Sequence, residues 1–352
     1  MLKIYQPAEA KQTILKRKPI DDYEIPESMQ QNMLKLFGEN LTPDQAVARI
    51  IKEVRSEGDQ ALRKWTQVLD GTALDRFRLT NEEIQAAKKS ISDEMKLALQ
   101  LSIERVQAFH QRQPLSSWIS NDLGGMVGQM IRPIRRVGLY IPAGTAPLPS
   151  SVIMSAVPAQ VAVVQEIVIV APPDRKTGKI SPLIAATAAL LGIHEMYAIG
   201  GAQAIAALAF GTESIRAVDK IFGPGNLFVM LAKKQVYGSV GIDNLAGPTE
   251  TMVIADEFAK PAWVAADLLA QAEHDLLASA ILLTPSLELA RQVDEEIQLQ
   301  AQKLSRTAMI NSSLLNRGGA VITKNIEEAV TLANDYGAEH LCLAVQQPWQ
   351  LV

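Results

Sequence analysis

Cysteine and aromatic residues are scarce in this sequence. Cys342 is the only cysteine among 352 residues, which excludes an intrachain disulfide framework and a zinc site built from several thiolates. A bound metal ion would therefore have to use nitrogen and oxygen ligands. Aromatic residues make up 5% of the chain, whereas hydrophobic residues make up 48% and charged residues 20%. This composition excludes general disorder and predicts a globular protein with aliphatic cores.

A large net charge is lacking as well. The formal charge of -4 offers no electrostatic footprint for a nucleic-acid backbone or an anionic membrane surface. The most apolar stretch, residues 152–171, is interrupted by Pro158 and Glu166, so it falls short of the ~20 apolar residues of a membrane-spanning helix. The opening MLKIYQPAEAKQ has no apolar core of a secretory signal. We therefore expect a cytoplasmic enzyme with a small-molecule partner, no nucleic acid and no membrane.

Helix-start signals stand at two places in the first third of the chain. TPDQ at 42–45 offers an N-cap threonine, a proline at the first helical position and a glutamine at the third. TNEE at 80–83 repeats the capping-box pattern. A long run of residues with helical character follows each signal, so residues 42–113 are predicted to be helical.

After Pro133 the pattern changes to short β-branched runs that alternate with alanine-rich helical stretches. The predicted strands are EIVIVAPP, EMYAIGG, KIFGPGN, ETMVIAD, AILLTP, GAVITK and HLCLAV. Strands that alternate with helices imply crossover connections and parallel sheets covered on both faces. The fold class is therefore α/β.

The length suggests two domains, each with its own parallel sheet. We expect an N-terminal arm over residues 1–29 and a Rossmann-like domain over 140–250. Residues 30–139 have no apparent sheet of their own, so we expect them to pack with 251–352 in a second, discontinuous α/β domain. The expected architecture is thus two incomplete Rossmann-like sheets with an N-terminal helical region and arm. No internal repeat is visible in the sequence.

Two glycine turns each follow a predicted strand and open a helix. Gly200-Gly201-Ala202-Gln203 follows MYAI, and Gly223-Pro224-Gly225-Asn226 follows KIF. Backbone N–H groups at such helix starts favour a phosphate. Neither turn matches GxGxxG or precedes a clear ribose-binding acid, so the glycines could equally serve only as turn residues. A third segment, YIPAGT at 140–145, could place the Tyr140 ring against a nicotinamide or adenine, or simply pack at the surface.

Two of the four histidines have neighbours that could do chemistry. Gln271 and His274 lie three residues apart at the end of a predicted helix and share one face. They could bridge a metal ion, or His274 could interact only with the helix dipole. Glu339 and His340 directly precede the strand HLCLAV, where a carboxylate could activate water and an imidazole could move protons. Glu-His is also a common dipeptide, and the remaining histidines look like a solvated helix residue and a turn residue.

Six phrases in order resemble the histidinol dehydrogenase family. They are VGLYIPAGTAPLPSSVIM, GGAQAIAALAFGTE, VDKIFGPGN, AGPTE, DLLAQAEHD and NDYGAEHL. The resemblance covers nearly the whole chain. It implies the NAD-dependent oxidation of L-histidinol to L-histidine in two hydride transfers through an aldehyde, at the end of histidine biosynthesis. It also implies a zinc ion that orients the substrate.

The resemblance assigns roles to the polar residues of the second half. It implies that Gln271 and His274 are zinc ligands that also contact the substrate, and that Thr249 is a further substrate contact. His340 would be the general base for the alcohol, and Glu339 would activate water for the aldehyde step. Both would also bind substrate. Without the resemblance, the same residues would fit a metal hydrolase with Glu339 as its base.

The resemblance further implies that Tyr140, Gln203 and Asn226 contact NAD and that the protein is a homodimer. In the family, an Asp and a His that complete the zinc shell, and one more substrate-binding Glu, follow the part that ends here at Val352. The expected zinc ligand set is therefore incomplete, because zinc normally takes at least three protein ligands. A smaller departure is Ala143, where the family often has glycine. The competing hypothesis is a catalytically inactive relative that serves as a nucleotide-binding or assembly module.

Overall fold

The structure is a computed structural model of the chain, and it describes residues 2–17, 27–114, 116–142, 147–245, 249–274 and 277–352. The chain divides into two compact units. Unit 1 comprises residues 1–24 and 247–352, and unit 2 comprises residues 25–246. Over the described part of the chain, no helix is long and apolar enough to cross a membrane.

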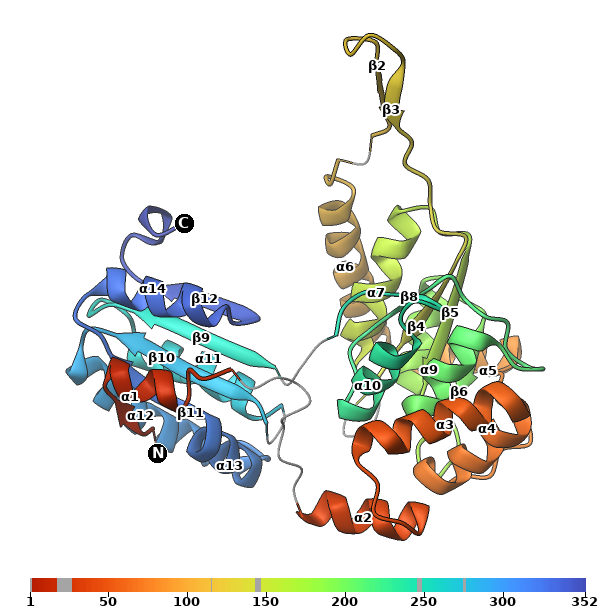
Figure 1. Ribbon diagram of the computed structural model, residues 1–352, viewed down its shortest axis with the longest axis horizontal. Coiled ribbons are helices and arrows are strands. Elements are labelled where there is room, and N and C mark those ends of the chain that lie inside the picture. Colours follow the sequence, from red (N-terminus) through yellow and green to blue (C-terminus); the bar gives the residue numbers. More distant parts are fainter. Residues whose placement is uncertain (1, 18–26, 115, 143–146, 246–248, 275–276) are drawn as a thin grey trace. The chain divides into compact units, whose positions relative to one another are not determined.

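Unit 2 contains a parallel sheet with the strand order β6-β5-β4-β7-β8 (Figure 1). Its strands are β4 (Arg136–Tyr140), β5 (Glu166–Ala171), β6 (Met196–Ala198), β7 (Lys220–Phe222) and β8 (Gly241–Ile242). The intervening helices are α7 (Pro149–Val161), α8 (Pro182–Leu190), α9 (Gly201–Phe210) and α10 (Leu227–Val236). In chain order the arrangement is 3-2-1-4-5, which is the beginning of a Rossmann sheet.

The first helices of the chain also belong to unit 2. They are α2 (Glu27–Phe37), α3 (Pro43–Glu57), α4 (Asp59–Trp65), the π-helix η2 (Thr66–Asp70), α5 (Asn81–Ser90) and α6 (Asp93–His110). Both predicted capping boxes are present, at Thr42 and at Thr80. An antiparallel hairpin of β2 (Trp118–Ser120) and β3 (Val127–Gln129) extends beyond the end of α6 (Figure 1).

The expected pairing of residues 30–139 with 251–352 is not what the structure has. Within unit 2, α3 lies against α9 and α10, α5 lies against α8, and α6 lies against α7. The physical reason is that the apolar faces of α5 and α6 join the core of the β4 sheet, where Ile84 and Leu99 are buried. Moreover, β4 begins at Arg136, before the expected boundary at residue 140.

Unit 1 contains a second parallel sheet, with the order β1-β11-β10-β9-β12. Its strands are β1 (Ile4–Tyr5), β9 (Glu250–Ala255), β10 (Ser279–Thr284), β11 (Gly318–Ile322) and β12 (His340–Ala344). Its helices are α1 (Pro7–Gln12), α11 (Pro261–Ala272), α12 (Leu287–Ala301), α13 (Thr307–Arg317), α14 (Ile326–Tyr336) and the 3-10 helix η3 (Pro348–Gln350). Separate apolar cores cover the two faces of this sheet.

The N-terminal segment is part of this sheet and not only an arm. Ile4 and Tyr5 pair in parallel with Ala320 and Val321 of β11, and Ala10 of α1 is fully buried. The later part of the expected arm, residues 18–26, lies outside the described residues.

The two sheets share one strand arrangement that the sequence did not reveal. Strands β9, β10, β11 and β12 lie in the order 3-2-1-4, as β4, β5, β6 and β7 do in unit 2. All seven predicted strands are present, and both sheets are parallel. The expected α/β fold with two incomplete Rossmann-like sheets is therefore confirmed.

Candidate functional site

Four of the predicted site residues meet at the amino edge of the unit 1 sheet. Thr249 directly precedes β9, whereas Glu339 and His340 stand at the start of β12, which pairs with β9 in parallel. Gln271 lies in the last turn of α11. A crossover helix runs back to the edge at which parallel strands begin, so Gln271 arrives at the same edge. This is the edge opposite to the one where open α/β sheets usually bind ligands.

A line of hydrogen bonds joins these side chains. Gln271 Nε2 donates to Thr249 Oγ1, and Thr249 Oγ1 donates to Glu339 Oε2 at 3.0 Å. The other carboxylate oxygen of Glu339 lies 3.9 Å from His340 Nε2. Gln271 is buried, while 48% of the Glu339 side chain and 61% of the His340 side chain are exposed. The buried side of the site thus fixes the Glu339 carboxylate by hydrogen bonds, while the carboxylate and the His340 imidazole remain accessible to solvent.

His274 follows the end of α11 and shares its final turn with Gln271. Its backbone N–H donates to the Gln271 carbonyl oxygen at 3.1 Å, and the residue is exposed. Three of the six sequence phrases are only partly described, because residues 143–146, 246–248 and 275–276 lie outside the described residues. Among the residues that are described, no group of three or more His, Cys, Asp or Glu side chains could hold a metal ion.

A second polar group, which sequence reasoning missed, supports the backbone before Glu339. Arg17 Nη2 donates to Glu250 Oε2 and to the Gly337 carbonyl oxygen, both at 2.6 Å. The Tyr336 hydroxyl donates to Glu250 Oε1 at 3.2 Å. Burial, together with the Glu250 charge, raises the pKa of Tyr336 to about 12. The local sequence signal here is Gly337, a residue typical of helix ends. In the structure it ends α14 in the left-handed conformation, with a φ of +62°.

In unit 2, the predicted cofactor residues lie at the carboxyl edge of the sheet. Tyr140 ends β4 and is 4% exposed. Its hydroxyl accepts a hydrogen bond from the Gly201 N–H at 3.2 Å, and burial raises its pKa to about 12. The structure therefore buries Tyr140 against the first glycine turn. Residues 143–146, including Ala143, Gly144 and Thr145, lie outside the described residues.

Gln203 is fully buried on α9, and one of the two polar groups of its side-chain amide is hydrogen-bonded. Its Nε2 donates to Asp70 Oδ2 at 3.1 Å, whereas its Oε1 finds no hydrogen-bond partner in the described structure. Burial raises the pKa of Asp70 to about 6, although Arg175 and hydrogen bonds from Gln203 and Gly200 oppose the shift. Asp70, at the end of η2, was missed because no local pattern links it to a residue so far along the chain.

The second glycine turn packs on the end of β4. Gly223 has a φ of +118°, and a side chain there would overlap the carbonyl oxygen of Tyr140. The Gly223 N–H donates to Asp243 Oδ2 at 2.8 Å. The buried Lys233 donates to the Gly223 carbonyl oxygen at 3.0 Å and pairs with Asp243. Asn226 caps α10, because its Oδ1 accepts two backbone N–H groups of the first turn.

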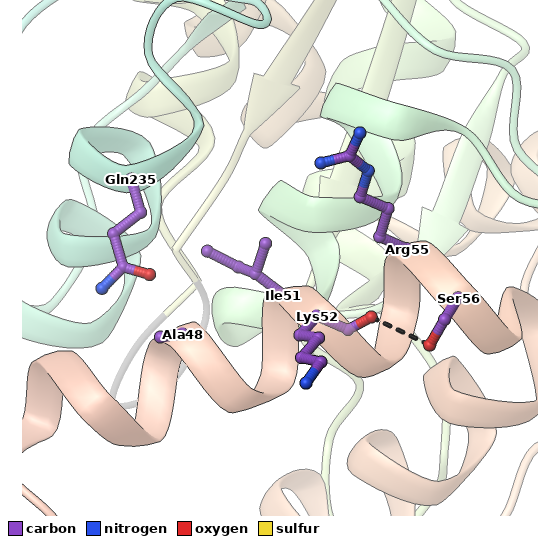
Figure 2. Close-up of a pocket in the computed structure, with 6 residues that line it drawn as sticks. All are labelled: Ala48, Ile51, Lys52, Arg55, Ser56 and Gln235. Atoms are coloured by element: carbon purple, nitrogen blue, oxygen red, sulfur yellow. Dashed lines mark hydrogen bonds between the residues drawn. The ribbon is translucent and has the colours of Figure 1, made fainter.

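A surface hollow of unit 2 is separate from the predicted site residues. It is lined by Ala48, Ile51, Lys52, Arg55, Ser56 and Gln235, from α3 and α10. In Figure 2 the two cationic side chains of this hollow point in different directions. The hollow therefore lacks the convergent polar groups of a small-molecule site.

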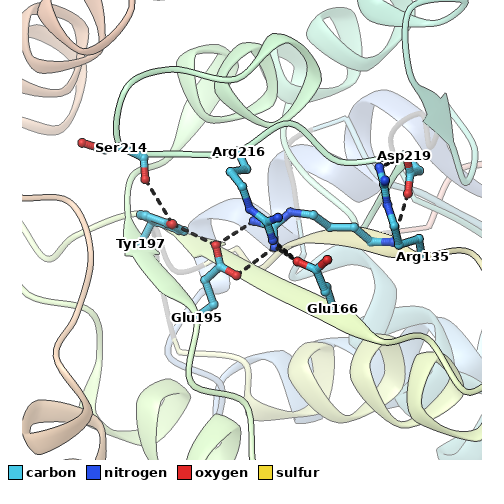
Figure 3. Close-up of polar contacts among 8 residues, drawn as sticks. Arg135, Glu166, Glu195, Tyr197, Ser214, Arg216 and Asp219 are labelled. Carbon is cyan, nitrogen blue, oxygen red and sulfur yellow. Dashed lines mark hydrogen bonds and ion pairs between the residues drawn. The ribbon is translucent and has the colours of Figure 1, made fainter.

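The amino edge of the unit 2 sheet carries a network of ion pairs (Figure 3). Arg136 is 2% exposed and donates to Glu166 at 2.8 Å and to Glu195 at 2.6 Å. Arg216 also pairs with Glu166, and the Tyr197 hydroxyl donates to Glu195 at 2.9 Å. Although burial opposes it, hydrogen bonds and the Arg136 charge lower the pKa of Glu195. The network ties together the starts of three adjacent strands.

Comparisons with known proteins agree with the sequence resemblance. The family model for histidinol dehydrogenase matches residues 39–352. The histidinol dehydrogenase of Moorella thermoacetica is 50% identical over 306 residues, which cover 86% of this chain and 72% of that protein. That of Deinococcus radiodurans is 44% identical over 353 residues, covering 100% of this chain and 80% of the relative.

A solved structure agrees as well. The crystal structure of histidinol dehydrogenase from Elizabethkingia anophelis has a TM-score of 0.87 and 36% sequence identity, and the match covers 99% of this chain and 77% of that chain. Sequence phrases, family model, relatives and fold all coincide. The chain belongs to the histidinol dehydrogenase family and is an oxidoreductase of histidine biosynthesis.

Proposed function

We propose that this chain uses NAD to oxidise L-histidinol to L-histidine through the aldehyde, in two hydride transfers, and that it works as a cytoplasmic homodimer. Family membership supports the overall reaction. The single structural observation that supports the chemistry is the line of hydrogen bonds from Gln271 through Thr249 to Glu339, with His340 beside it.

His340 is proposed to serve the first oxidation. When a hydride leaves the alcohol carbon, the hydroxyl must lose its proton to a base. The imidazole is exposed, so a substrate can reach it, and the Glu339 carboxylate 3.9 Å away stabilises the imidazolium that forms. NAD, when bound, supplies the hydride acceptor for both oxidations.

Glu339 is proposed to serve the second oxidation. Water must add to the aldehyde before the second hydride can leave, and a carboxylate can take the proton of that water. Thr249 donates to one oxygen of Glu339, which leaves the other oxygen on the side of His340. Thr249 and the buried Gln271 therefore act as positioning groups for the base, and Thr249 also lies where a substrate would meet it.

The described residues do not by themselves complete a zinc shell. Gln271 and His274 would supply one oxygen and one nitrogen ligand from the last turn of α11. A zinc ion normally takes at least three protein ligands, and no cluster of that kind stands among the described residues. No step of the proposed chemistry is therefore assigned to the metal.

The carboxyl edge of unit 2 fits a dinucleotide in its polar groups. Two glycine turns open α9 and α10 there, and the buried Gln203 Oε1 is an acceptor without a partner in the described structure. Tyr140, Gln203 and Asn226 would hold NAD at this edge. The alternative of a catalytically inactive relative finds no support in the comparisons.

Two single substitutions test the division of labour between the bases. NADH formation is followed by absorbance, once with L-histidinol and once with the aldehyde as substrate. We expect His340→Asn to slow the oxidation of the alcohol by about 10²- to 10⁴-fold. Glu339→Gln should mainly slow the oxidation of the aldehyde. His110→Asn, a change at a half-buried residue of α6 in unit 2, is the matched control. Unchanged rates in both site variants would contradict the proposal.

A further inference from the structure

One buried oxygen at the carboxyl edge of unit 2 has no hydrogen-bond partner among the described residues. Gln203 has no exposed surface, and its Oε1 makes no hydrogen bond in the described structure. A buried acceptor without a donor destabilises the folded state, because it has lost its hydrogen bonds to water and gained none in return. Such a cost persists in functional sites when a ligand supplies the missing partner. The oxygen lies at the first turn of α9, where a side chain on Gly201 would come within 2.6 Å of it.

The other end of the same amide is fixed by a residue from a different part of the chain. Gln203 Nε2 donates to Asp70 Oδ2 at 3.1 Å. Asp70 ends η2, a π-helical turn of a kind that recurs at functional sites. The Gly200 backbone lies near enough to the Asp70 carboxylate to favour its ionised form and so to lower its pKa. An acidic residue from a distant part of the chain thus lies beside the first glycine turn.

The ionised form of Asp70 dictates which way the amide faces. A carboxylate can only accept hydrogen bonds, so the amide must turn its N–H₂ group toward Asp70. Oε1 then has to face the other side. A protonated Asp70 could donate as well as accept, and it would allow either orientation of Gln203.

In the described structure, the first glycine turn carries a hydrogen-bond acceptor without a partner, the Gln203 Oε1 atom. The Gly201 N–H donates to the Tyr140 hydroxyl, and the Asp70 carboxylate lies beside Gly200. The N–H group of Gly201 is therefore already engaged within the protein. A carboxylate beside the turn also repels a second anion. What the turn offers is an acceptor oxygen, which is complementary to an O–H or N–H group.

We propose that Asp70 is a positioning residue of the cofactor site, which fixes the Gln203 amide so that Oε1 accepts a hydrogen bond from a hydroxyl or amide N–H group of the bound nucleotide. The inference deepens the proposed function and rests on it for the identity of the ligand. The part of the inference that concerns the orientation of Gln203 by Asp70 does not depend on which ligand binds.

The surroundings of Asp70 make this control sensitive to pH. Arg175 favours the ionised form and Gln203 and Gly200 hydrogen-bond to it, whereas burial opposes it and raises the pKa to about 6. Tyr140, the other titratable group nearby, has a pKa raised to about 12 and stays neutral in this range. Asp70 is therefore ionised at pH 7.5 and largely protonated at pH 5.

The first test measures NAD binding to the full chain by calorimetry between pH 5 and 8. The wild-type chain should bind about three- to tenfold more weakly at pH 5 than at pH 7.5, the worth of one hydrogen bond. Asp70→Asn, which keeps the size of the side chain, should bind weakly at both values. Asp75→Asn removes the same charge at an exposed position five residues away and should retain the wild-type profile. An Asp70→Asn variant with unaltered affinity and pH profile would overturn the proposal.

A double-mutant cycle tests whether Asp70 acts through Gln203. Gln203→Met removes the amide from a buried position at similar volume and should weaken NAD binding. Adding Asp70→Asn to that variant should cause no further loss, because nothing remains to be oriented. An equal loss in both backgrounds would refute the positioning role.

A third measurement needs no cofactor. The side-chain N–H₂ resonance of Gln203, assigned from the Gln203→Met spectrum, should shift with a midpoint near pH 6, and this step should vanish in Asp70→Asn. If the step is seen but NAD does not bind, the proposed cofactor is wrong while the orientation of Gln203 by Asp70 holds. If the resonance does not respond to pH, the positioning role itself fails.

Discussion

Replacing Asp70 by asparagine should stabilise unit 2 at neutral pH. Folding raises the pKa of Asp70 from 3.8 to about 6. A pKa difference of one corresponds to about 1.36 kcal/mol between the two protonation states, so the ionised carboxylate costs the folded state up to ~3 kcal/mol. Asparagine of the same size carries no charge and avoids this cost. Partial solvent exposure of Asp70 reduces the gain, which makes ~3 kcal/mol an upper value.

The gain in stability of Asp70→Asn over the wild-type chain must depend on pH in a defined direction. Between about pH 4 and 6 the folded state binds the Asp70 proton while the unfolded state has released it. The stability of the wild-type unit therefore falls as pH rises through this window, and the loss is complete above about pH 7. The difference between Asp70→Asn and wild type should be near zero at pH 4 and largest at pH 7.5.

Tryptophan fluorescence during urea unfolding measures this difference. Trp65 is 2% exposed in unit 2, whereas Trp118, Trp263 and Trp349 are exposed, so the change in emission reports mainly on unit 2. Asp75→Asn should leave the profile unchanged. A stability difference that is the same at pH 4 and 7.5 would refute the reasoning from ionisation. A destabilised Asp70→Asn variant would mean that the hydrogen bonds of Asp70 outweigh its desolvation.

Three further predictions concern other parts of the fold. Glu195→Gln leaves the buried Arg136 guanidinium with one ionic partner fewer and should cost unit 2 about 3 kcal/mol in urea unfolding; a loss under about 1 kcal/mol contradicts this. Gly223→Ala places a methyl group against the Tyr140 carbonyl oxygen, so it should prevent folding or lower the free energy of unfolding by more than about 3 kcal/mol. Gly71 also has a positive φ but open space around it, so Gly71→Ala should lower the free energy of unfolding by only about 1 kcal/mol. Burial raises the pKa of Cys342 to about 11, so iodoacetamide at pH 8 should react at least about tenfold more slowly than after unfolding; equal rates would show the thiol to be accessible.

The sequence predicts elements well where short-range interactions define them. Thr42 and Thr80 begin helices because each side chain accepts a backbone N–H three residues on, and the third residue returns the hydrogen bond. The predicted strands are likewise defined by runs of β-branched residues bounded by turns. Both signals operate within a few residues.

Long-range packing explains the part of the fold that was mispredicted. The apolar faces of α5 and α6 show that these helices cover a sheet, but they do not show which sheet. Ile84 and Leu99 would be equally suited to either core by their chemistry, and they lie in that of unit 2. The assignment of residues 30–139 to the other unit failed for this reason.

The glycine turns illustrate why anion-binding signals need the surrounding structure. Helix-start glycines favour an anion through their backbone N–H groups, but a side chain of the protein can be that anion. Asp243 accepts from the Gly223 N–H, and the Asp70 carboxylate lies beside Gly200. The residues that satisfy the turns come from distant segments, so the sequence pattern could not distinguish a cofactor cradle from a turn that is already occupied.

The candidate site in unit 1 follows from topology once the strand order is known. Gln271 and Glu339 are far apart in sequence, but α11 ends at the edge where β9 and β12 begin. Any parallel β-α-β unit returns its helix to that edge, so the end of one crossover helix and the residues just before a neighbouring strand lie at the same edge. Glu339 and His340 are ambiguous as a dipeptide in the sequence. They form part of a candidate site because β12 pairs with β9, which places the Thr249 hydroxyl next to the Glu339 carboxylate.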